Sequence, residues 1–201
     1  ELIQQEILRQ TNQQLTQLNQ AYERFVPREF LHYLGRDSIT EVGLGDQTQA
    51  DITILFGDIR SFTTLSEQMT PQENFNFINA YLGRISPIIR EHRGFIDKYL
   101  GDGLMALFPE QAEDAILAAI QMQYKVAEYN RHRQQRGRQS ISIGLGLHTG
   151  RVMLGTIGET KRMESTVISD AVNLTARLEG LTKFYGVSIV VSETTLFSLE
   201  N

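Results

Sequence analysis

The first 25 residues combine a helical spacing of apolar side chains with a polar, Gln-rich background. Two series of positions repeat every seven residues, namely Leu8, Leu15 and Tyr22, and Thr11, Leu18 and Phe25. This is the a/d spacing of a coiled coil, sustained over only about three heptads. We interpret residues 1–26 as a helical linker of coiled-coil type that follows upstream domains. The alternative is an amphipathic helix that packs on its own domain.

Residues 27–201 alternate between short apolar runs and longer amphipathic segments, which predicts one mixed domain. Strands are expected at residues 51–56, 95–100, 104–108, 141–147, 151–157 and 187–191. Helices are expected at residues 28–34, 71–93, 111–133 and 171–185. Gly94 is placed just past the end of the second helix, and Pro87 predicts a kink or an unpaired carbonyl within it. This order indicates an α+β fold with a ferredoxin-like, palm-like core, in which a split βαβ unit forms a central, mostly antiparallel sheet with flanking helices.

Composition excludes several function classes without choosing one. The chain has 201 residues, of which 41% are hydrophobic and 21% charged, as is ordinary for a globular domain. It has no cysteine, which excludes a disulfide scaffold, a thiolate zinc site and a cysteine nucleophile. The net charge of −5 disfavours nucleic-acid binding through a cationic face. The longest apolar run, Ala115 to Ile120, is too short to span a membrane, and no signal peptide is recognised, so we expect a cytoplasmic protein.

Two aspartates occupy positions that suit metal ligands. Asp58 follows a buried strand in the segment FGDIRSFT, and Asp102 lies between two glycines at a hairpin tip in KYLGDGLMALF. Two carboxylates at adjacent strand ends could hold Mg²⁺, which combines a few carboxylates with phosphate oxygens. The alternatives are local, with Asp102 as a turn residue that tolerates a left-handed backbone and Asp58 as a cap. The spacing alone does not show that the two side chains meet.

Three further residues are candidates for phosphate binding. Asn173 and Arg177 are four residues apart near the start of a predicted helix, where they share a face and lie beside backbone N–H groups. Arg151 follows a predicted turn at residues 148–150. Each residue also has a structural interpretation, as a surface pair or as a solvated strand residue. The sequence has neither a P-loop pattern nor a GxGxxG segment followed by a helix.

Three segments in a fixed order make the sequence similar to a known family. FGDIRSFT, then KYLGDGLMALF, then TVISDAVNLTARLE resemble the catalytic domain of class III nucleotidyl cyclases, over a span from about Asp51 to Val191. Each segment alone is weak evidence, but the three together are specific. The overall pattern is most similar to cyanobacterial and related bacterial adenylate cyclases of the subgroup that includes bicarbonate-responsive enzymes.

The resemblance implies a two-metal reaction on ATP. Asp58 and Asp102 correspond to the family's metal-binding aspartates, with the Ile59 carbonyl as a further ligand for two divalent ions, Mg²⁺ or Mn²⁺. One metal would activate the ribose 3′-hydroxyl for attack on the α-phosphorus, and the other would hold the triphosphate. The products would be 3′,5′-cyclic AMP and pyrophosphate. Asn173 would orient the ribose, and Arg177 would stabilise charge on the α-phosphate.

The resemblance also implies how the substrate is selected and how the chain assembles. Lys98 and Thr166 correspond to the purine-selecting pair, in which the lysine donates to an adenine ring nitrogen and the threonine accepts from the exocyclic amine. Arg151 corresponds to a position that contacts the terminal phosphates. Domains of this family pair head to tail, so a homodimer would hold two equivalent sites. Each site would take its metal aspartates from one chain and Lys98, Thr166, Asn173 and Arg177 from the other.

Two alternatives to an adenylate cyclase are considered. A guanylate cyclase would use the same fold, but that class has Glu and Cys or a similar residue at the purine-selecting positions, where this chain has Lys98 and Thr166. A non-catalytic, nucleotide-binding regulatory domain would have lost core residues that are all present here. The subgroup resemblance further implies bicarbonate stimulation and control by upstream sensory domains within a larger signalling protein.

Overall fold

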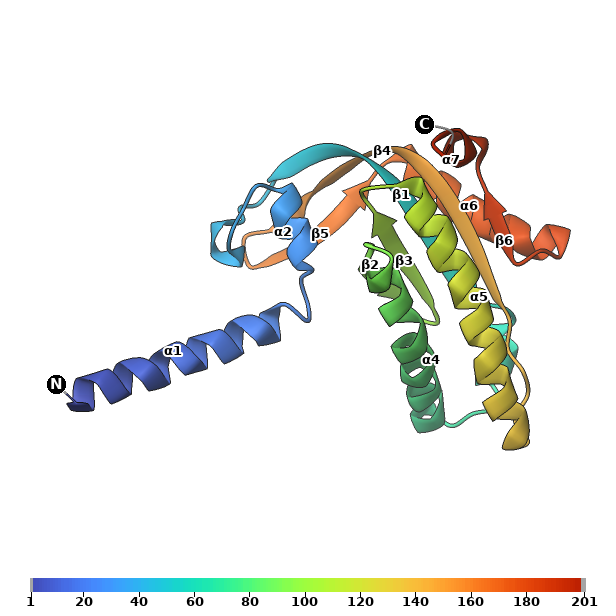
Figure 1. The fold of residues 1–201 in the computed structure, drawn as a ribbon, viewed down its shortest axis with the longest axis horizontal. Coiled ribbons are helices and arrows are strands. Elements are labelled where there is room, and N and C mark those ends of the chain that lie inside the picture. The colour runs from blue at the N-terminus through green and yellow to red at the C-terminus, as the bar shows by residue number, and fades with distance from the viewer. Residues whose placement is uncertain (1, 200–201) are drawn as a thin grey trace.

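A six-stranded sheet forms the centre of the structure, a computed structural model that describes residues 2–199 (Figure 1). The strands are β1 (Gln47–Ile59), β2 (Phe95–Leu100), β3 (Gly103–Phe108), β4 (Ile143–Glu159), β5 (Arg162–Ile168) and β6 (Ile189–Val191). The helices are α1 (Leu2–Tyr22), α2 (Arg28–Tyr33), α3 (Phe62–Ser66), α4 (Pro71–Glu91), α5 (Ala112–Gln135), α6 (Asp170–Tyr185) and α7 (Glu193–Phe197), with a short 3-10 helix, η1 (Ile39–Glu41). The predicted α+β class is confirmed.

The strand order confirms the predicted split βαβ core. The strands follow the order β2-β3-β1-β4-β5 across the sheet, and the short β6 also pairs with β4. The β4–β6 pair is parallel and the other pairs are antiparallel. β1 and β2 are joined through α4 and are separated by β3, which is the split βαβ arrangement. α5 and β4 complete the ferredoxin-like core.

Helices cover both faces of the sheet (Figure 1). α4 and α5 pack on one face over a core that includes Leu55, Tyr81, Phe108, Met122 and Leu145. α6 packs on the other face of β4 at such close range that a Cβ on Gly146 would collide with the backbone of Glu179. A second apolar cluster lies on this same side and includes Phe30 of α2, Ile52, Val152 and Val167.

β4 is one continuous strand of 17 residues, so the prediction of two strands around a turn at residues 148–150 is wrong. Positions 148–150 pair residue for residue with β1 and continue the ladder. The prediction failed because burial changes along the strand: residues 143–148 are buried on both faces, whereas the outer half is partly exposed. β5 pairs with that outer half and was not predicted, since its sequence RMESTVI opens with charged, exposed residues.

The end of α4 also differs from the prediction. Arg93, and not Gly94, adopts the left-handed backbone conformation, with φ at +59°. Gly94 lies instead against the ring of Phe108, where a Cβ would come within 2.5 Å of a ring carbon. The glycine is therefore required for packing rather than for its φ angle. Pro87 lies inside a helix that continues to Glu91.

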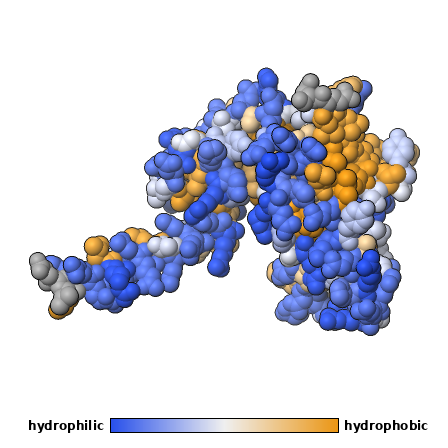
Figure 2. Space-filling model, viewed as in Figure 1, coloured by the Kyte–Doolittle hydropathy of each residue, from blue (hydrophilic) through white to orange (hydrophobic). Residues whose placement is uncertain are grey.

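α1 extends away from the sheet as a separate arm (Figure 1), and residues 3–22 are exposed along its length. Figure 2 shows this arm as largely hydrophilic with apolar side chains along it. The apolar heptad residues Leu8, Leu15, Leu18 and Tyr22 are 50–61% exposed, so they do not pack on their own domain. Within residues 2–199, the helices are too short or too polar to cross a membrane.

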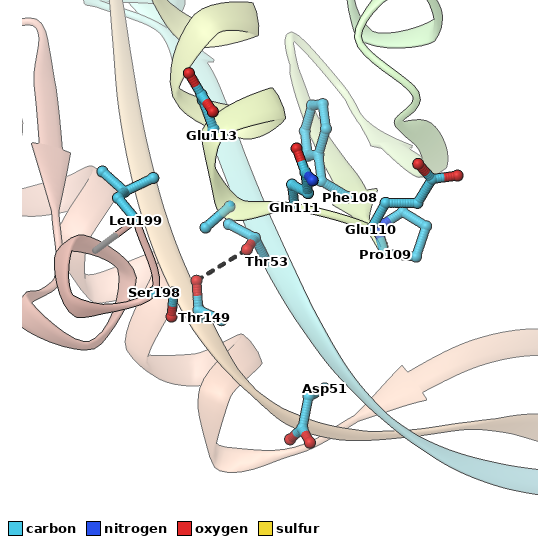
Figure 3. Close-up of a pocket in the computed structure, with 11 residues that line it drawn as sticks. Asp51, Thr53, Phe108, Pro109, Glu110, Gln111, Glu113, Thr149, Ser198 and Leu199 are labelled. Carbon is cyan, nitrogen blue, oxygen red and sulfur yellow. Dashed lines mark hydrogen bonds between the residues drawn. The ribbon is translucent and has the colours of Figure 1, made fainter. Parts of the chain in front are cut away.

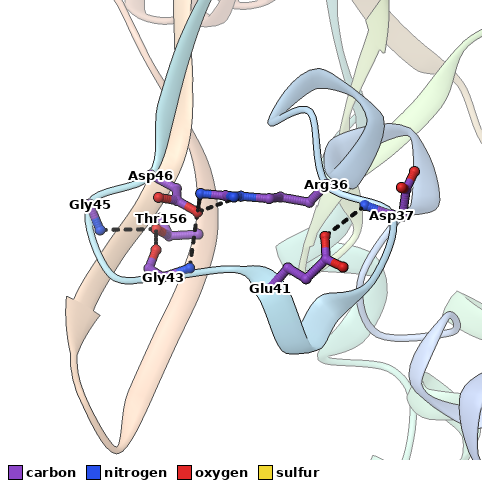
Figure 4. Close-up of polar contacts among 7 residues, drawn as sticks. All are labelled: Arg36, Asp37, Glu41, Gly43, Gly45, Asp46 and Thr156. Carbon is purple, nitrogen blue, oxygen red and sulfur yellow. Dashed lines mark hydrogen bonds and ion pairs between the residues drawn. The ribbon is translucent and has the colours of Figure 1, made fainter.

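The segment between α2 and β1 is tied to the outer half of β4 (Figure 4). Asp46 pairs with Arg36 at 3.0 Å and accepts a hydrogen bond from the N–H of Gly43 at 3.0 Å. The Thr156 hydroxyl donates to the Gly43 carbonyl at 2.6 Å and accepts from the N–H of Gly45 at 3.1 Å. The loop at residues 43–46 is thus an ordered connection that fixes the start of β1 against β4.

Candidate active site

The structure brings Asp58 and Asp102 together. Asp58 lies near the end of β1, and Asp102 lies in the two-residue turn between β2 and β3. β3 pairs with β1 as far as Leu104 opposite Gly57, which places this turn beside Asp58. The two carboxyl groups lie close enough for Asp58 to influence the protonation of Asp102. The proximity that the sequence could not show is therefore produced by strand pairing.

The glycines around Asp102 allow this close approach. Gly101 takes the left-handed conformation, with φ at +67°, whereas Asp102 does not, so the turn-tolerance interpretation of Asp102 is not supported. A Cβ on Gly103 would come within 2.9 Å of the β1 backbone and 3.3 Å of Asp58 Oδ1. The N–H of Ile59 donates to that same oxygen at 2.9 Å. The end of β1 and the β2–β3 turn are therefore packed without intervening side chains.

The crowding of two carboxyl groups changes the protonation of Asp102. Burial is the largest cause, and together with the neighbouring Asp58 carboxylate it raises the pKa of Asp102 to about 7. Oδ2 of Asp102 is buried, and within residues 2–199 it has no hydrogen-bond partner. A divalent cation would satisfy this oxygen and neutralise the crowded pair, so the residues fit the predicted metal ions. The described chain has no cluster of three or more ligating side chains, so further ligands would be backbone, water or phosphate oxygens.

Lys98 and Thr166 also come together. The Nζ atom of Lys98, on β2, donates to Oγ1 of Thr166, on β5, at 3.3 Å. β2 and β5 are opposite ends of the strand order, so this contact requires a sheet that curves until its two ends approach each other. Thr166 is buried, and the Lys98 side chain is 29% exposed. A lysine donor and a hydroxyl are thus held side by side in a partly accessible position.

Two acids near Lys98 were not found from the sequence. Asp97 Oδ2 lies 3.4 Å from the Lys98 ammonium, and Glu164 Oε1 lies 3.7 Å from it. In a regular strand neighbouring side chains point to opposite faces, so the sequence predicts no contact between Asp97 and Lys98. Glu164 lies on β5, a strand that the sequence did not predict.

Asn173 and Arg177 lie on the exposed side of α6, while the buried Thr175 between them faces the sheet. The helix begins with Ser169 as its N-cap, whose hydroxyl accepts a hydrogen bond from the N–H of Ala171 at 3.0 Å. No hydrogen bond or ion pair to another side chain in residues 2–199 holds Asn173 or Arg177. Both side chains are therefore available to a ligand near the N-terminal half of the helix.

Arg151 lies within β4 rather than after a turn, and it faces an acid on the neighbouring strand. Its Nε lies 3.2 Å from Oδ1 of Asp51, and the two side chains are 67% and 66% exposed. Exposed pairs of this kind are weak because water screens them. Breaking this ion pair would cost little free energy, so the Arg151 guanidinium is available to bind a phosphate instead.

A pocket of ≈ 340 Å³ lies between the start of α5, the end of the described chain and strands β1 and β4 (Figure 3). The hydroxyls of Thr53 and Thr149 are 2.8 Å apart at its wall, and Asp51, Glu110 and Glu113 make its lining acidic. None of the predicted site residues lines this pocket, and its acidic lining does not suit a triphosphate. The candidate active site is therefore formed by the two residue pairs described above.

Glu179 is a further acid near the aspartate pair that sequence reasoning did not identify. It lies on α6, and burial, followed by the charge of Asp58, raises the pKa of its carboxyl. Its location under β4 follows from the glycines at positions 144 and 146, which admit the helix. The segment NLTARLE contains this residue but gives no sign of its burial.

Comparisons with known proteins agree with this geometry. Residues 44–201 match the family model described as the adenylate and guanylate cyclase catalytic domain. The chain is 44% identical over 184 residues to the adenylate cyclase of Anabaena cylindrica, which covers 89% of this chain and 37% of that protein. The chain therefore spans much less than two thirds of this curated relative.

Solved structures show the same fold. The guanylyl cyclase Cya2 is 36% identical with a TM-score of 0.67, covering 78% of this chain and 80% of that one. A bacterial light-regulated adenylyl cyclase is 27% identical with a TM-score of 0.82, covering 98% of this chain and 58% of that one. The predicted cyclase resemblance is confirmed, and the chain belongs to the family of adenylate and guanylate cyclase catalytic domains.

Proposed function

We propose that this chain is the catalytic domain of an adenylate cyclase, which converts ATP to 3′,5′-cyclic AMP and pyrophosphate. The observation that carries the proposal is the 3.3 Å contact between Lys98 Nζ and Thr166 Oγ1. Adenine offers a ring nitrogen that accepts and an exocyclic amine that donates, and this pair complements both. The 44% identity to the Anabaena cylindrica adenylate cyclase supports the same substrate.

Asp58, Asp102 and the carbonyl of Ile59 would hold two divalent ions, Mg²⁺ or Mn²⁺. Such ions, when bound, stabilise the negative charge that develops at phosphate and favour ionisation of the ribose 3′-hydroxyl. The two aspartates would fix the position of the ions, because both belong to tightly packed backbone, at the end of β1 and in the β2–β3 turn. In the reaction, the 3′-oxygen bonds to the α-phosphorus and the bond to the pyrophosphate oxygen breaks.

Three polar side chains would bind the sugar and the phosphates. Asn173 would hydrogen bond the ribose and orient its 3′-oxygen. Arg177, one helical turn away on the same face, would donate to the α-phosphate oxygens, where charge accumulates as the bond to pyrophosphate breaks. Arg151 would bind the terminal phosphates in place of its exposed partner Asp51.

We propose that the active form is a head-to-tail homodimer. The aspartate pair and the Lys98–Thr166 pair each form within one chain, so each chain can contribute both as preformed units. Each of the two sites would combine the aspartates of one chain with Lys98, Thr166 and α6 of its partner. The exposed heptad positions of α1 would hold the two chains together as a linker.

Guanylate cyclase activity is the second candidate function. Glu164 Oε1 lies 3.7 Å from Lys98 Nζ, and a carboxylate at this place could accept from the N1–H and amino groups of guanine. The solved guanylyl cyclase Cya2, at 36% identity, shares the fold. Glu164 is 61% exposed, whereas Thr166 is buried, and this difference favours the adenine-binding interpretation.

The wider context belongs to the same proposal. A larger, cytoplasmic signalling protein with upstream sensory domains agrees with the 37% share of the Anabaena cylindrica relative that the chain spans. Stimulation by bicarbonate rests on the resemblance to the bicarbonate-responsive subgroup and on Thr166 at the base-selecting position.

The test is a turnover assay with ATP and with GTP, in Mg²⁺ or Mn²⁺, across a range of protein concentrations. We expect cyclic AMP formation that depends on the metal and an activity per chain that rises with concentration until dimers saturate. Formation of cyclic GMP at the higher kcat/KM would favour the second candidate. A metal-independent or absent turnover of both nucleotides would contradict both.

A further inference from the structure

We infer that Asp97 is a positioning residue for purine selection, which holds the Lys98 ammonium beside Thr166. The inference rests on the proposed role of Lys98 in reading the base. Asp97 itself would not touch the nucleotide, because its side chain is only 1% exposed. Its effect would be exerted through the orientation of a flexible lysine.

A β-bulge makes the contact possible. Ile96 of β2 pairs with Ala106 of β3, and Lys98 pairs with the next residue, Met105, so Asp97 is the extra residue on β2. A bulge interrupts the strict alternation of faces and re-aims side chains. Asp97 Oδ2 and Lys98 Nζ consequently lie 3.4 Å apart although the residues are adjacent on one strand.

Lysine needs such a partner if it is to read a base. Its ammonium is a point charge on a four-carbon chain with several rotatable bonds, so one contact leaves it free to move. Thr166 supplies one contact at 3.3 Å, and Asp97 supplies a second from another direction at 3.4 Å. The hydrogen bond to Thr166 and the ion pair with Asp97 together restrict the position of the ammonium.

Asp97 and Glu164 differ in how much of each side chain is exposed, and this gives them different effects on Lys98. Glu164 lies at a similar distance from Lys98 but is 61% exposed, so water and salt screen its charge. The Asp97 carboxylate is shielded, and its Oδ2 has no hydrogen-bond partner within residues 2–199. A buried carboxylate is costly unless a cation compensates it, and Lys98 is the cation in contact with it. Burial raises the pKa of Asp97, and the neighbouring Lys98 charge opposes that shift.

The experiment measures binding of 3′-deoxyATP and 3′-deoxyGTP with Mg²⁺ to the purified protein. These nucleotides lack the attacking hydroxyl, so their affinity ratio is read without turnover. Asp97→Asn keeps the shape and removes the charge, Glu91→Gln at the exposed end of α4 is the matched control, and Lys98→Ala supplies the background for a double-mutant cycle. Asp97→Ser is a second variant, for use if the amide of Asp97→Asn perturbs folding. Thermal unfolding checks the fold of each variant.

We expect Asp97→Asn to reduce the preference for the adenine nucleotide about tenfold and Glu91→Gln to change it less than about twofold. In the Lys98→Ala background, Asp97→Asn should have no further effect, because the group it positions is gone. A merely structural role would weaken both nucleotides equally and leave the ratio unchanged, which would overturn the inference. The inference also fails if the effect persists without Lys98, or if Lys98→Ala does not alter the ratio. The proposed function fails separately, through an absence of cyclic nucleotide formation by the unaltered protein.

Discussion

Lys98 Nζ lies 3.3 Å from Thr166 Oγ1, although the two residues are 68 positions apart and occupy strands at opposite ends of the sheet order. The contact depends on the curvature that brings the β4–β5 hairpin back towards β2. It places the Lys98 ammonium, a donor, beside the Thr166 hydroxyl, an acceptor, so that both can hydrogen bond to the edge of one base. The first prediction addresses this pair.

Replacing Lys98 by Glu together with Thr166 by Cys should shift substrate preference towards GTP. A carboxylate accepts from the N1–H and amino groups of guanine, whereas the original ammonium cannot. The ratio of kcat/KM for ATP to that for GTP should fall by about tenfold or more. Lys183→Glu, at an exposed position near the end of α6, is the control and should leave the ratio unchanged. An unaltered ratio in the double variant would show that the pair does not select the base.

Asp58→Asn should lower metal-dependent turnover by a factor on the order of 100 or more while the fold is retained. The amide preserves the shape but removes one charge from the pair that would hold the divalent ions. Steady-state kinetics against Mg²⁺ and Mn²⁺ concentration, with circular dichroism for the fold, make the measurement. Asp37→Asn, on the exposed connection before η1, should behave as the unaltered protein. Full activity of Asp58→Asn would exclude Asp58 as a metal ligand.

The metal-free protein should lose stability as the pH rises through neutrality. The pKa of Asp102 is raised from its ordinary value of 3.8 to about 7, so the folded state binds the proton more tightly than the unfolded chain. Its stabilising contribution is complete below pH 3.8 and is lost as the pH rises through about 7. Thermal unfolding in a chelator between pH 5 and pH 8 should therefore show a falling midpoint.

Asp58→Asn should flatten that dependence, because it removes the neighbouring charge that opposes ionisation of Asp102. Added Mg²⁺ should restore stability mainly at the upper end of the range, where both carboxyl groups are charged. A pH dependence that persists unchanged in Asp102→Asn would assign the effect to another group.

Gly146→Ala should destabilise the fold by about 1–3 kcal/mol, because the new Cβ would meet the α6 backbone at Glu179. Gly180→Ala on the same helix is the matched control, since a Cβ there meets no atom within 4 Å. That control should stabilise the protein by about 0.5–1 kcal/mol through helix propensity. Urea unfolding of both variants gives the comparison. Equal stability in the two variants would contradict the tight packing of α6 on β4.

Leu15→Lys should weaken the proposed homodimer about tenfold or more, because it places a charge at the centre of the a/d seam of α1. Leu15 is 53% exposed in the single chain, so the change should not disturb folding. Gln13→Lys lies on the opposite side of the helix and is the control. Analytical ultracentrifugation provides the dissociation constants. An unchanged dimer in Leu15→Lys would assign dimerisation to the catalytic domain alone.

The sequence by itself determined the β2–β3 hairpin, the identity of the candidate residues and five of the seven helices within residues 2–199. The short α3 and α7 were not predicted. Helical spacing and the glycine-flanked turn at Asp102 are local signals, and each was reproduced within a few residues. The three motifs also pointed to the cyclase family without any knowledge of distances.

Only the tertiary structure decided which of these residues meet. The aspartate pair depends on the register of β3 against β1, and the Lys98–Thr166 contact depends on the curvature of the whole sheet. The continuous β4 and the unpredicted β5 were misread because long-range pairing overrides local pattern where burial changes along a strand. The contact between Asp97 and Lys98 was not predicted for a related reason. It depends on a β-bulge, which is defined by the pairing of two strands and is not encoded in the sequence of one strand.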